Sequence, residues 1–365
     1  MALAEALVQH GRRDLRLTEV PLPELQAGAA ILRVEACGLC GSDIEALDGE
    51  AGAAFPRVMG HEIVGTIEAL GPGGRRDVEV GDRVAVDPWL PCGGCRHCLA
   101  GMAQLCDGWS WKESRLACYG FIAMANEPGL WGGYSSHVYI HLKTVLYPIP
   151  EGLGPLDAAL WNPLAAGIEW AVLTPGTAVG SSVAILGCGQ RGLASTVAAR
   201  AAGASRILVT GLAKDAPKLA LAREFGADVA VDVENESLRD RARALTPGGK
   251  FDVVVDTASF STQPVVDSLT LVRPGGRVVY AGLKAKDVDG FPIDKAIMKG
   301  VTMTGVLGVS SDAYRRAVDL LASRRFPLER MRTHVFDYRD AVEGIDTLAG
   351  RVEGSDAINI VLSHR

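Results

Sequence analysis

The chain has 365 residues, a formal net charge of −6 at pH 7 and a hydrophobic content of 48%, and its length suits about two domains of ~150 residues each. The acidic balance argues against a nucleic-acid partner, because phosphates favour a basic face. No apolar run reaches the ~20 residues that span a bilayer, and Met1–His10 contains Glu5 and lacks the parts of a signal peptide. We therefore expect no membrane partner and a cytoplasmic location, where cysteines act as metal ligands or buried thiols rather than as disulfides.

The N-terminal part of the chain predicts an irregular, mostly antiparallel β domain. Its apolar runs are short, alternate with polar residues or are rich in β-branched residues, and are separated by Gly and Pro. The clearest strands are expected at Ile31–Ala36, His61–Leu70 and Asp82–Asp87.

Two short polar motifs adjoin these strands. Cys40 follows the first strand, and the pair His61 and Glu62 opens the second. A thiolate, an imidazole and a carboxylate can hold zinc and leave a fourth position open for water or substrate, as a catalytic zinc requires. A His beside a Glu is, taken alone, more often a hydrogen-bonded surface pair. In combination with the cysteine loop and the glycine turn described next, we predict a catalytic zinc site.

A segment with the spacing C-x2-C-x2-C-x7-C follows, formed by Cys92, Cys95, Cys98 and Cys106. Two-residue spacers let neighbouring thiolates point at one centre, and a closed set of four sulfurs leaves no open position, which is typical of a structural zinc. An iron–sulfur cluster also uses four cysteines. A nucleic-acid-binding zinc ribbon would pair two separated knuckles in a basic context, and four unrelated thiols are the remaining alternative. The spacing favours structural zinc.

The pattern changes near Pro150–Pro155, after which strands and helices alternate. Six apolar runs begin at Ser182, Arg206, Val229, Phe251, Gly276 and Val301. Alanine-rich helical segments separate several of them, which indicates an α/β domain with a doubly wound parallel sheet covered on both faces. The tail contains a polar helix at Tyr314–Ser323 and a last strand, and we assign it back to the first domain. The predicted domains are 1–160 with 309–365, and 161–308.

A G-x-G-x-x-G turn opens the second domain. Its residues are Gly187, Cys188, Gly189, Gln190, Arg191 and Gly192. The turn directly follows a strand and opens a helix, which is the context that a dinucleotide-binding turn needs. The glycines allow a tight turn and a close approach of backbone N–H groups to a pyrophosphate. A flexible glycine loop is the structural alternative.

The end of the second strand predicts the type of nicotinamide cofactor. An NAD-binding domain places an acidic residue there, about 20 residues after the glycines, to hold the ribose hydroxyls. Here the position is Gly211, and Lys214 and Lys218 follow, while Arg191 lies in the turn. A missing acid with cations nearby favours a 2′-phosphate, so NADP is expected over NAD. The alternative is that these cations are solvated and NAD binds without its usual acid.

Taken together, these motifs closely resemble the zinc-containing medium-chain dehydrogenase/reductase family, which includes alcohol, polyol and sugar dehydrogenases. The resemblance covers nearly the whole chain. Besides the four-cysteine loop, it rests on Cys37–Asp43 (CGLCGSD), Gly60–Gly65 (GHEIVG), Val80–Val84 (VGDRV) and Gly187–Gly192 (GCGQRG). It implies a β-rich, GroES-like catalytic domain beside a Rossmann domain, and two zinc ions per chain.

The resemblance also implies roles for individual residues. Cys40 and His61 would bind the catalytic zinc, and Glu62 would be a permanent or intermittent ligand. Ser42 would take the alcohol proton. Asp43 would orient the imidazole, a role that a metal-bound histidine usually needs another group to fill.

Two positions depart from the family pattern. The family often has Glu, Asp or Cys before a Pro-Leu pair at or near the metal, whereas this chain has Asn162. We expect Glu62 and a water rather than Asn162 to complete the zinc sphere. Where some members carry a proton-relaying His, this chain has Glu45. Glu45 is interpreted as a proton acceptor or a hydrogen-bond partner of a substrate hydroxyl, with a solvated carboxylate as the alternative.

The remaining thiols and the indoles receive simpler interpretations. Cys37, Cys118 and Cys188 are expected to be small buried thiols. Trp161 is the best candidate to line a substrate cleft, and core packing is expected for the other tryptophans of this region: Trp89, Trp109, Trp111 and Trp131.

The predicted activity is hydride transfer between the nicotinamide and an alcohol or carbonyl carbon of a small molecule. Reduction of an activated carbon–carbon double bond is the enzymatic alternative, kept open by Asn162 and Glu45. A cofactor-binding protein with a degraded site is the non-enzymatic one. The family forms dimers or tetramers, and the apolar strand near Val301 suits a subunit edge, so a homo-oligomer is expected.

Overall fold

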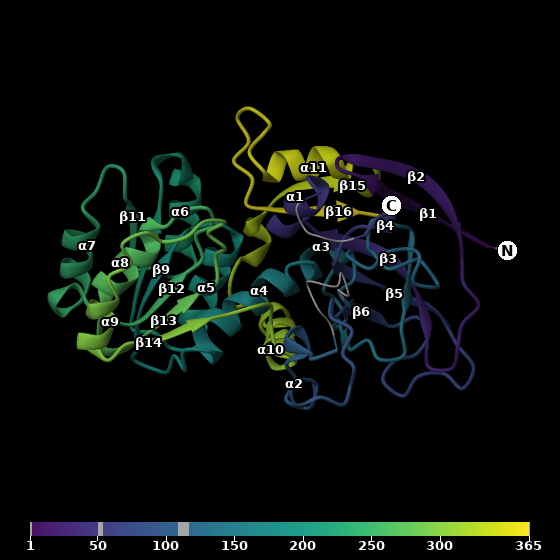
Figure 1. Ribbon diagram of the computed structural model, residues 1–365, viewed down its shortest axis with the longest axis horizontal. Helices are drawn as coiled ribbons and strands as arrows, with labels where there is room; N and C mark the ends of the chain where they lie inside the picture. The colour runs from purple at the N-terminus through teal and green to yellow at the C-terminus, as the bar shows by residue number, and fades with distance from the viewer. Residues whose placement is uncertain (1, 50–53, 109–116, 365) are drawn as a thin grey trace. The chain divides into compact units, whose positions relative to one another are not determined.

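The computed structural model describes residues 2–49, 54–108 and 117–364 (Figure 1). Trp109 and Trp111 therefore lie outside the described residues. The chain divides into two compact units: the first contains Met1–Asn162, Ser310–Arg324 and Arg332–Arg365, and the second contains Pro163–Val309 and Arg325–Met331. No helix within the described ranges is both long and apolar enough to cross a bilayer.

The tail differs from the predicted domain assignment at Val309, which belongs to the second unit, and in one further segment. Arg325–Met331 belongs to the second unit, although the flanking segments belong to the first. Arg330 of this segment forms an ion pair with Glu224 of the second unit, and Leu328 and Met331 are buried. The segment is thus grouped with the second unit, whereas the prediction placed the whole of 309–365 in the first domain.

The first unit is built mainly from short strands. They are β1 (Leu3–Gly11), β2 (Asp14–Pro21), β3 (Ala30–Gly38), β4 (Arg57–Val58), β5 (Glu62–Leu70), β6 (Arg83–Val86), β7 (His137–Ile140), β8 (Leu146–Pro148), β15 (Arg332–Asp337) and β16 (Asn359–Ser363). Its helices are α1 (Gly41–Leu47), α2 (Arg96–Leu99), α3 (Pro155–Ala158), α10 (Ser311–Ala322) and α11 (Ala341–Leu348).

These strands form two sheets, with orders β2-β1-β4 and β15-β16-β3-β5-β6-β8, and β7 pairs with β3 outside that path. All pairs are antiparallel except β15 with β16. The mostly antiparallel, irregular β architecture predicted from the sequence is thus confirmed. The neighbouring strands β3 and β5 contribute buried side chains to the core of this unit, among them Leu32, Val34, Ile63 and Ile67.

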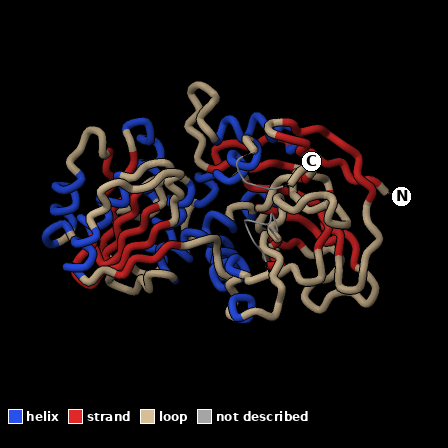
Figure 2. Tube along the Cα trace, in the orientation of Figure 1, coloured by secondary structure: helices blue, strands red, loops and turns tan. Residues whose placement is uncertain are grey.

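The second unit holds a single parallel sheet in the order β11-β10-β9-β12-β13-β14. The strands are β9 (Ser182–Leu186), β10 (Arg206–Gly211), β11 (Val229–Asp232), β12 (Phe251–Asp256), β13 (Val272–Tyr280) and β14 (Thr302–Gly305). Figure 2 shows them side by side with helices flanking them. The six predicted runs are these six strands, and the predicted doubly wound fold is confirmed.

Helices connect the strands of this sheet as crossovers. They are α5 (Gln190–Ala201), α6 (Ala216–Glu224), α7 (Leu238–Leu245), α8 (Gln263–Leu271) and α9 (Ile293–Lys299). The helix α4 (Trp161–Ile168) spans the boundary between the units and continues as a π-helical turn at Glu169–Leu173. Because the strand order reverses between β9 and β12, the carboxyl ends of these two strands are where a doubly wound fold binds its ligand.

Asp87, just after β6, is a fully buried carboxyl group of the first unit. Its Oδ2 accepts a hydrogen bond of 2.8 Å from the Tyr147 hydroxyl, and its Oδ1 accepts one of 3.0 Å from the Trp89 backbone N–H. Burial raises the pKa of Asp87 to about 6, although both hydrogen bonds act to lower it. The Tyr147 ring in turn packs against Trp161 and Tyr314.

The buried Asp87 predicts a specific pH dependence of stability. Its pKa is higher in the folded chain than its ordinary value of 3.8, so the unfolded chain ionises first as the pH rises. Relative to Asp87→Asn, the wild type should lose about 3 kcal/mol of unfolding free energy between about pH 4 and pH 6. Denaturant unfolding at several pH values measures this difference. The exposed Asp289→Asn serves as the control, and an Asp87→Asn curve parallel to the wild type would contradict the prediction.

Candidate functional site

The pairing register of β3 and β5 brings the first metal-binding candidates together. Gly38 at the end of β3 lies opposite Glu62 at the start of β5. Cys40 follows the end of β3 and His61 precedes β5, so all three residues lie at one end of this strand pair. Their ligand atoms lie within 4.8 Å of one another, and His61 and Glu62 are buried. A β-carbon at position 38 would lie 2.4 Å from Glu62 Oε2, so only glycine leaves room for this carboxylate.

Two neighbours on α1 flank the nitrogens of the His61 ring. Asp43 Oδ1 lies 3.5 Å from His61 Nδ1, and Ser42 Oγ lies 3.4 Å from Nε2. The other carboxylate oxygen of Asp43 accepts a hydrogen bond of 2.8 Å from the Cys40 backbone N–H. Asp43 therefore accepts a hydrogen bond from the backbone of Cys40 and lies beside Nδ1 of the imidazole, while Nε2 faces the side where Ser42 lies.

The electrostatics of this cluster favour a cation. Burial alone lowers the pKa of His61, but the Asp43 carboxylate and the Cys40 sulfur more than offset this and hold the pKa well above its ordinary value. The group therefore concentrates negative charge around one imidazole. Zinc accepts sulfur, nitrogen and carboxylate oxygen ligands, so the donor set fits a zinc ion with three protein ligands.

Gly60 sets the approach of the chain to this cluster. Its φ is +92°, and a β-carbon there would lie 2.4 Å from a ring carbon of Tyr134. The backbone N–H of Gly133 also donates a hydrogen bond of 2.9 Å to the Gly60 carbonyl. The glycine before His61 thus allows a left-handed turn pressed against a buried tyrosine.

Sequence spacing missed an aromatic contact of the site. The ring of Phe121 lies 5.6 Å from that of His61, at an interplanar angle of 51°. The guanidinium of the buried Arg57 lies 5.4 Å from the Phe121 ring centre. Phe121 comes from an irregular segment far along the chain, and no local pattern could have placed it beside the imidazole.

The three remaining residues that were predicted near the catalytic site differ in burial and in their contacts. Glu45 is half-buried on α1, in the same turn as Asp43. Asn162 is buried, and its Nδ2 donates a long hydrogen bond of 3.4 Å to the Tyr314 hydroxyl. Trp161 has no exposed surface and packs against Tyr147 and Tyr314. The prediction that Trp161 lines a substrate cleft is therefore wrong, because aromatic packing encloses this side chain completely.

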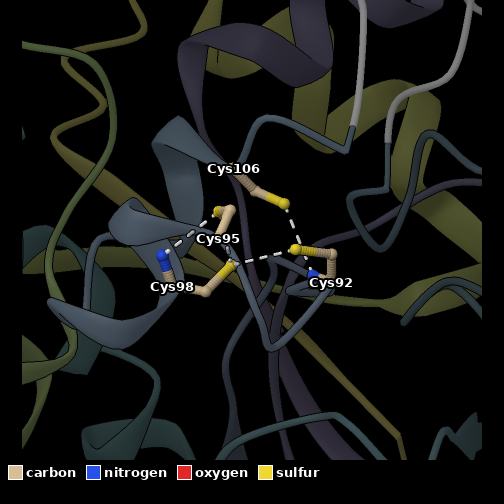
Figure 3. Close-up of side chains that lie close together, drawn as sticks. All are labelled: Cys92, Cys95, Cys98 and Cys106. Atoms are coloured by element: carbon tan, nitrogen blue, oxygen red, sulfur yellow. Dashed lines mark hydrogen bonds between the residues drawn. The ribbon is translucent and has the colours of Figure 1, made fainter.

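The four clustered cysteines converge on one centre (Figure 3). Cys95 Sγ lies 3.4 Å and Cys92 Sγ 3.8 Å from Cys98 Sγ. Zinc–sulfur bonds of about 2.3 Å in a tetrahedron place sulfurs ~3.8 Å apart. Cys106 Sγ accepts a backbone hydrogen bond of 3.4 Å from Cys92, which ties the ends of the loop together. The chemistry and spacing of these sulfurs fit a closed zinc site.

Backbone N–H groups stabilise a thiolate in this cluster. The N–H groups of Cys98 and Asp107 lower the pKa of Cys95 to about 6. Burial, together with the neighbouring sulfurs, raises the pKa of Cys98 to about 12. Four thiolates this close repel one another, so a central cation is needed to stabilise the fully deprotonated set.

The glycine turn lies at the carboxyl end of β9 in the second unit. Gly187 has a φ of +105°, and a β-carbon on Gly192 would lie only 2.0 Å from the Gly187 carbonyl oxygen. A β-carbon on Gly189 would meet nothing within 4 Å. Gly189 is the N-cap of α5, so the first backbone N–H groups of this helix, beginning at Gln190, are positioned to bind an anion. The turn thus fits the pyrophosphate of a dinucleotide.

The basic side chains that were predicted near the cofactor have different surroundings in the structure. Lys218 forms an ion pair of 3.0 Å with Asp215, and the Arg191 guanidinium lies 6.0 Å from the Trp170 ring centre. Lys214 is exposed. The remaining thiols, Cys37, Cys118 and Cys188, are buried.

Two family profiles match the chain. Residues 26–151 match the alcohol dehydrogenase GroES-like domain, and residues 192–323 match the zinc-binding dehydrogenase domain. A protein of Mycobacterium tuberculosis named probable alcohol dehydrogenase is 41% identical over 369 residues, covering 99% of both chains. The chain belongs to the zinc-type alcohol dehydrogenase family. As a member, it is a zinc-dependent oxidoreductase that acts on CH–OH groups.

Other relatives extend across the same family. The sorbitol dehydrogenase of Ovis aries is 30% identical over 347 residues, with 94% of this chain and 92% of the relative covered. Among solved structures, a protein of Sinorhizobium meliloti described as a zinc-binding dehydrogenase, with NADP bound, has a TM-score of 0.84 and 28% identity over 100% of both chains. An alcohol dehydrogenase of Thermotoga maritima has a TM-score of 0.88 at 23% identity, covering 100% of both chains, and supports the fold.

The glycine turn of this dehydrogenase yields a matched pair of predictions. Gly192→Ala forces a β-carbon against the Gly187 carbonyl, so it should lower the unfolding free energy by about 1–3 kcal/mol. Gly189→Ala meets open space, so it should leave stability nearly unchanged while weakening nicotinamide dinucleotide binding about ten-fold or more, because the added methyl group blocks the backbone approach.

Thermal unfolding and fluorescence titration with NADPH and NADH measure the two effects separately. Equal loss of stability in both variants would contradict the predicted difference between a crowded position 192 and an open position 189. Unaltered dinucleotide binding by Gly189→Ala would mean that the turn is not part of the cofactor site.

Proposed function

We propose that this chain catalyses reversible hydride transfer between NADP and the carbinol carbon of a polyol, sugar or related alcohol, at the site formed by Cys40, His61 and Glu62. The observation that carries the proposal is the convergence of these three ligand types within 4.8 Å. Three protein ligands are the number that leaves a coordination position open for substrate. Membership of the zinc-type alcohol dehydrogenase family supports the same chemistry.

We also propose two zinc ions per chain, one at each cluster. Cys92, Cys95, Cys98 and Cys106 would hold a structural ion, since four sulfurs close its coordination sphere. Cys40, His61 and Glu62 would hold the catalytic ion, with a water rather than Asn162 as the further ligand. The Asn162 amide oxygen is neutral, whereas Glu62 offers a carboxylate, and this difference supports the choice.

The residues around the catalytic site would have different roles in the reaction. Zinc, when bound, supplies a Lewis acid that stabilises a developing alkoxide, and the nicotinamide exchanges the hydride. Asp43, whose carboxylate lies 3.5 Å from Nδ1 of His61, would hold the ring so that Nε2 is kept for the metal. Ser42, whose Oγ lies on the Nε2 side of this ring, would accept the hydroxyl proton and pass it on towards solvent. Glu45 would hydrogen-bond a second substrate hydroxyl or accept the proton.

The substrate class follows from Glu45 and from the relatives. A carboxylate in place of a relaying histidine favours substrates with several hydroxyl groups, because it can accept hydrogen bonds from them. The relatives named sorbitol dehydrogenase also support a substrate with several hydroxyl groups. The preference for NADP rests on Gly211 in place of an acid and on the exposed Lys214 beyond it. The NADP bound by the Sinorhizobium meliloti relative is consistent with it.

An exposed sheet edge supports a homodimer or homotetramer. β14 pairs with β13 on one side only, and Met303 on this strand is partly exposed. Nearby in sequence, Ile297, Met298 and Leu307 are also exposed apolar residues. A second copy pairing along β14 would satisfy the free backbone groups and cover these side chains.

Removing one sulfur tests the structural zinc. Cys98→Ser should reduce bound zinc from about two equivalents per chain to about one, and lower the melting temperature by several degrees, because the metal stabilises the folded loop. Elemental analysis of the purified protein gives the zinc content. Cys188→Ala, which removes a thiol outside both clusters, should keep all of the zinc. Full zinc content in Cys98→Ser would mean that the loop does not hold the ion.

A substrate panel tests the proposed activity. Polyols, sugars and simple alcohols, and an enone for the alternative reaction, are assayed by the absorbance of reduced nicotinamide with NADP and with NAD. His61→Ala should lower kcat about a thousand-fold on any accepted alcohol while still binding NADPH. The exposed His10→Ala should match the wild type. Turnover of the enone alone, or near-normal turnover by His61→Ala, would overturn the proposal.

A further inference from the structure

The loop after β10 carries charges of both signs around the place expected for the adenosine ribose. Gly211 ends β10, and Lys214 follows three residues later. Glu234, from the loop after β11, reaches the same loop: its Oε2 accepts a hydrogen bond of 2.8 Å from the Ala213 backbone N–H. The β10 and β11 strands run parallel with Gly211 beside Asp232, which is why a residue shortly after β11 lies against Ala213.

Packing prevents Gly211 from carrying the usual acid. A β-carbon at this position would lie 2.5 Å from Cys188 Sγ and 3.1 Å from a methyl group of Leu219. The thiol belongs to the glycine turn, and both neighbours are buried. Discrimination between a ribose hydroxyl and a 2′-phosphate must therefore come from residues outside the strand.

Most other charges near this loop have partners of their own. Lys218 is neutralised by Asp215, and Asp215 also accepts a hydrogen bond from the Leu212 N–H. Asp232 accepts hydrogen bonds from the Glu234 N–H and the Asn235 amide. Glu236 forms an ion pair of 3.2 Å with Arg241. Within the described ranges, no ion pair is found for Lys214 or for Glu234.

We propose that Glu234 is a specificity-determining residue for the cofactor, which disfavours a 2′-phosphate and so opposes Lys214. This inference rests on the proposed nicotinamide-dependent function. The Glu234 carboxylate can accept a hydrogen bond from a ribose hydroxyl, but it repels the phosphate of NADP. Lys214, one residue from Ala213, attracts that phosphate. The preference between the two cofactors is then set by two opposite charges, one on the loop after β10 and one on the loop after β11 that contacts it.

Binding titrations test the proposal without substrate. Dissociation constants of NADPH and NADH are measured by fluorescence for the wild type, Glu234→Gln and Lys214→Gln at low ionic strength. Glu234→Gln keeps an acceptor for the Ala213 N–H and removes the charge. It should strengthen NADPH binding relative to NADH about five- to ten-fold, and Lys214→Gln should shift the ratio by a similar factor in the opposite direction. Both shifts should shrink as salt is added.

Glu236→Gln is the matched control, because it removes the same charge from the same loop where Arg241 already neutralises it. It should change the NADPH to NADH ratio by less than about two-fold. An unchanged ratio in Glu234→Gln, or an equal effect on both nucleotides, would overturn the inference and leave the dehydrogenase function intact. Failure of the wild type to bind either nucleotide would overturn the proposed function and the inference together.

Discussion

The pairing of β3 with β5 is the constraint on which the candidate catalytic site depends. Gly38 and Glu62 face each other at the end of this antiparallel pair, so the residues just beyond β3 and just before β5 must meet. A one-residue slip would turn every side chain of a strand to the opposite face. The buried residues of both strands prevent such a slip, since it would expose them. The hydrophobic core thus fixes the position of the candidate metal ligands Cys40, His61 and Glu62, although none of them belongs to that core.

The sequence was sufficient wherever a motif is local. The four cysteines lie within one short loop, and two-residue spacers already dictate how neighbouring sulfurs converge. The glycine turn is equally local: Gly187 and Gly192 belong to one strand–turn–helix unit, and the 2.0 Å approach at Gly192 gives the physical reason for a glycine there. The six parallel strands could be predicted because each is a continuous apolar run bounded by helices.

Contacts between distant segments could not be predicted in this way. Phe121 contacts His61 from an irregular segment with no periodic pattern. Trp161 was expected to line a cleft because Asn162 follows it, yet Tyr147 and Tyr314, from positions far apart in the sequence, enclose its ring. Charges raise the same difficulty. Lys214 and Lys218 look alike in the sequence, and only the structure shows that Asp215 neutralises one of them.

The close packing of Gly211 against Cys188 restricts how descendants of this sequence can change. The β-carbon of an aspartate at position 211 would collide with the sulfur and press on Leu219, so that substitution first requires a smaller residue in place of Cys188 and a shift of the Leu219 side chain. The two positions are therefore epistatic, and the order of the mutations matters. Exposed loop residues, by contrast, can mutate singly without such a prior change. Lineages that share this turn should accordingly diverge first in their loops and only later at the end of the strand.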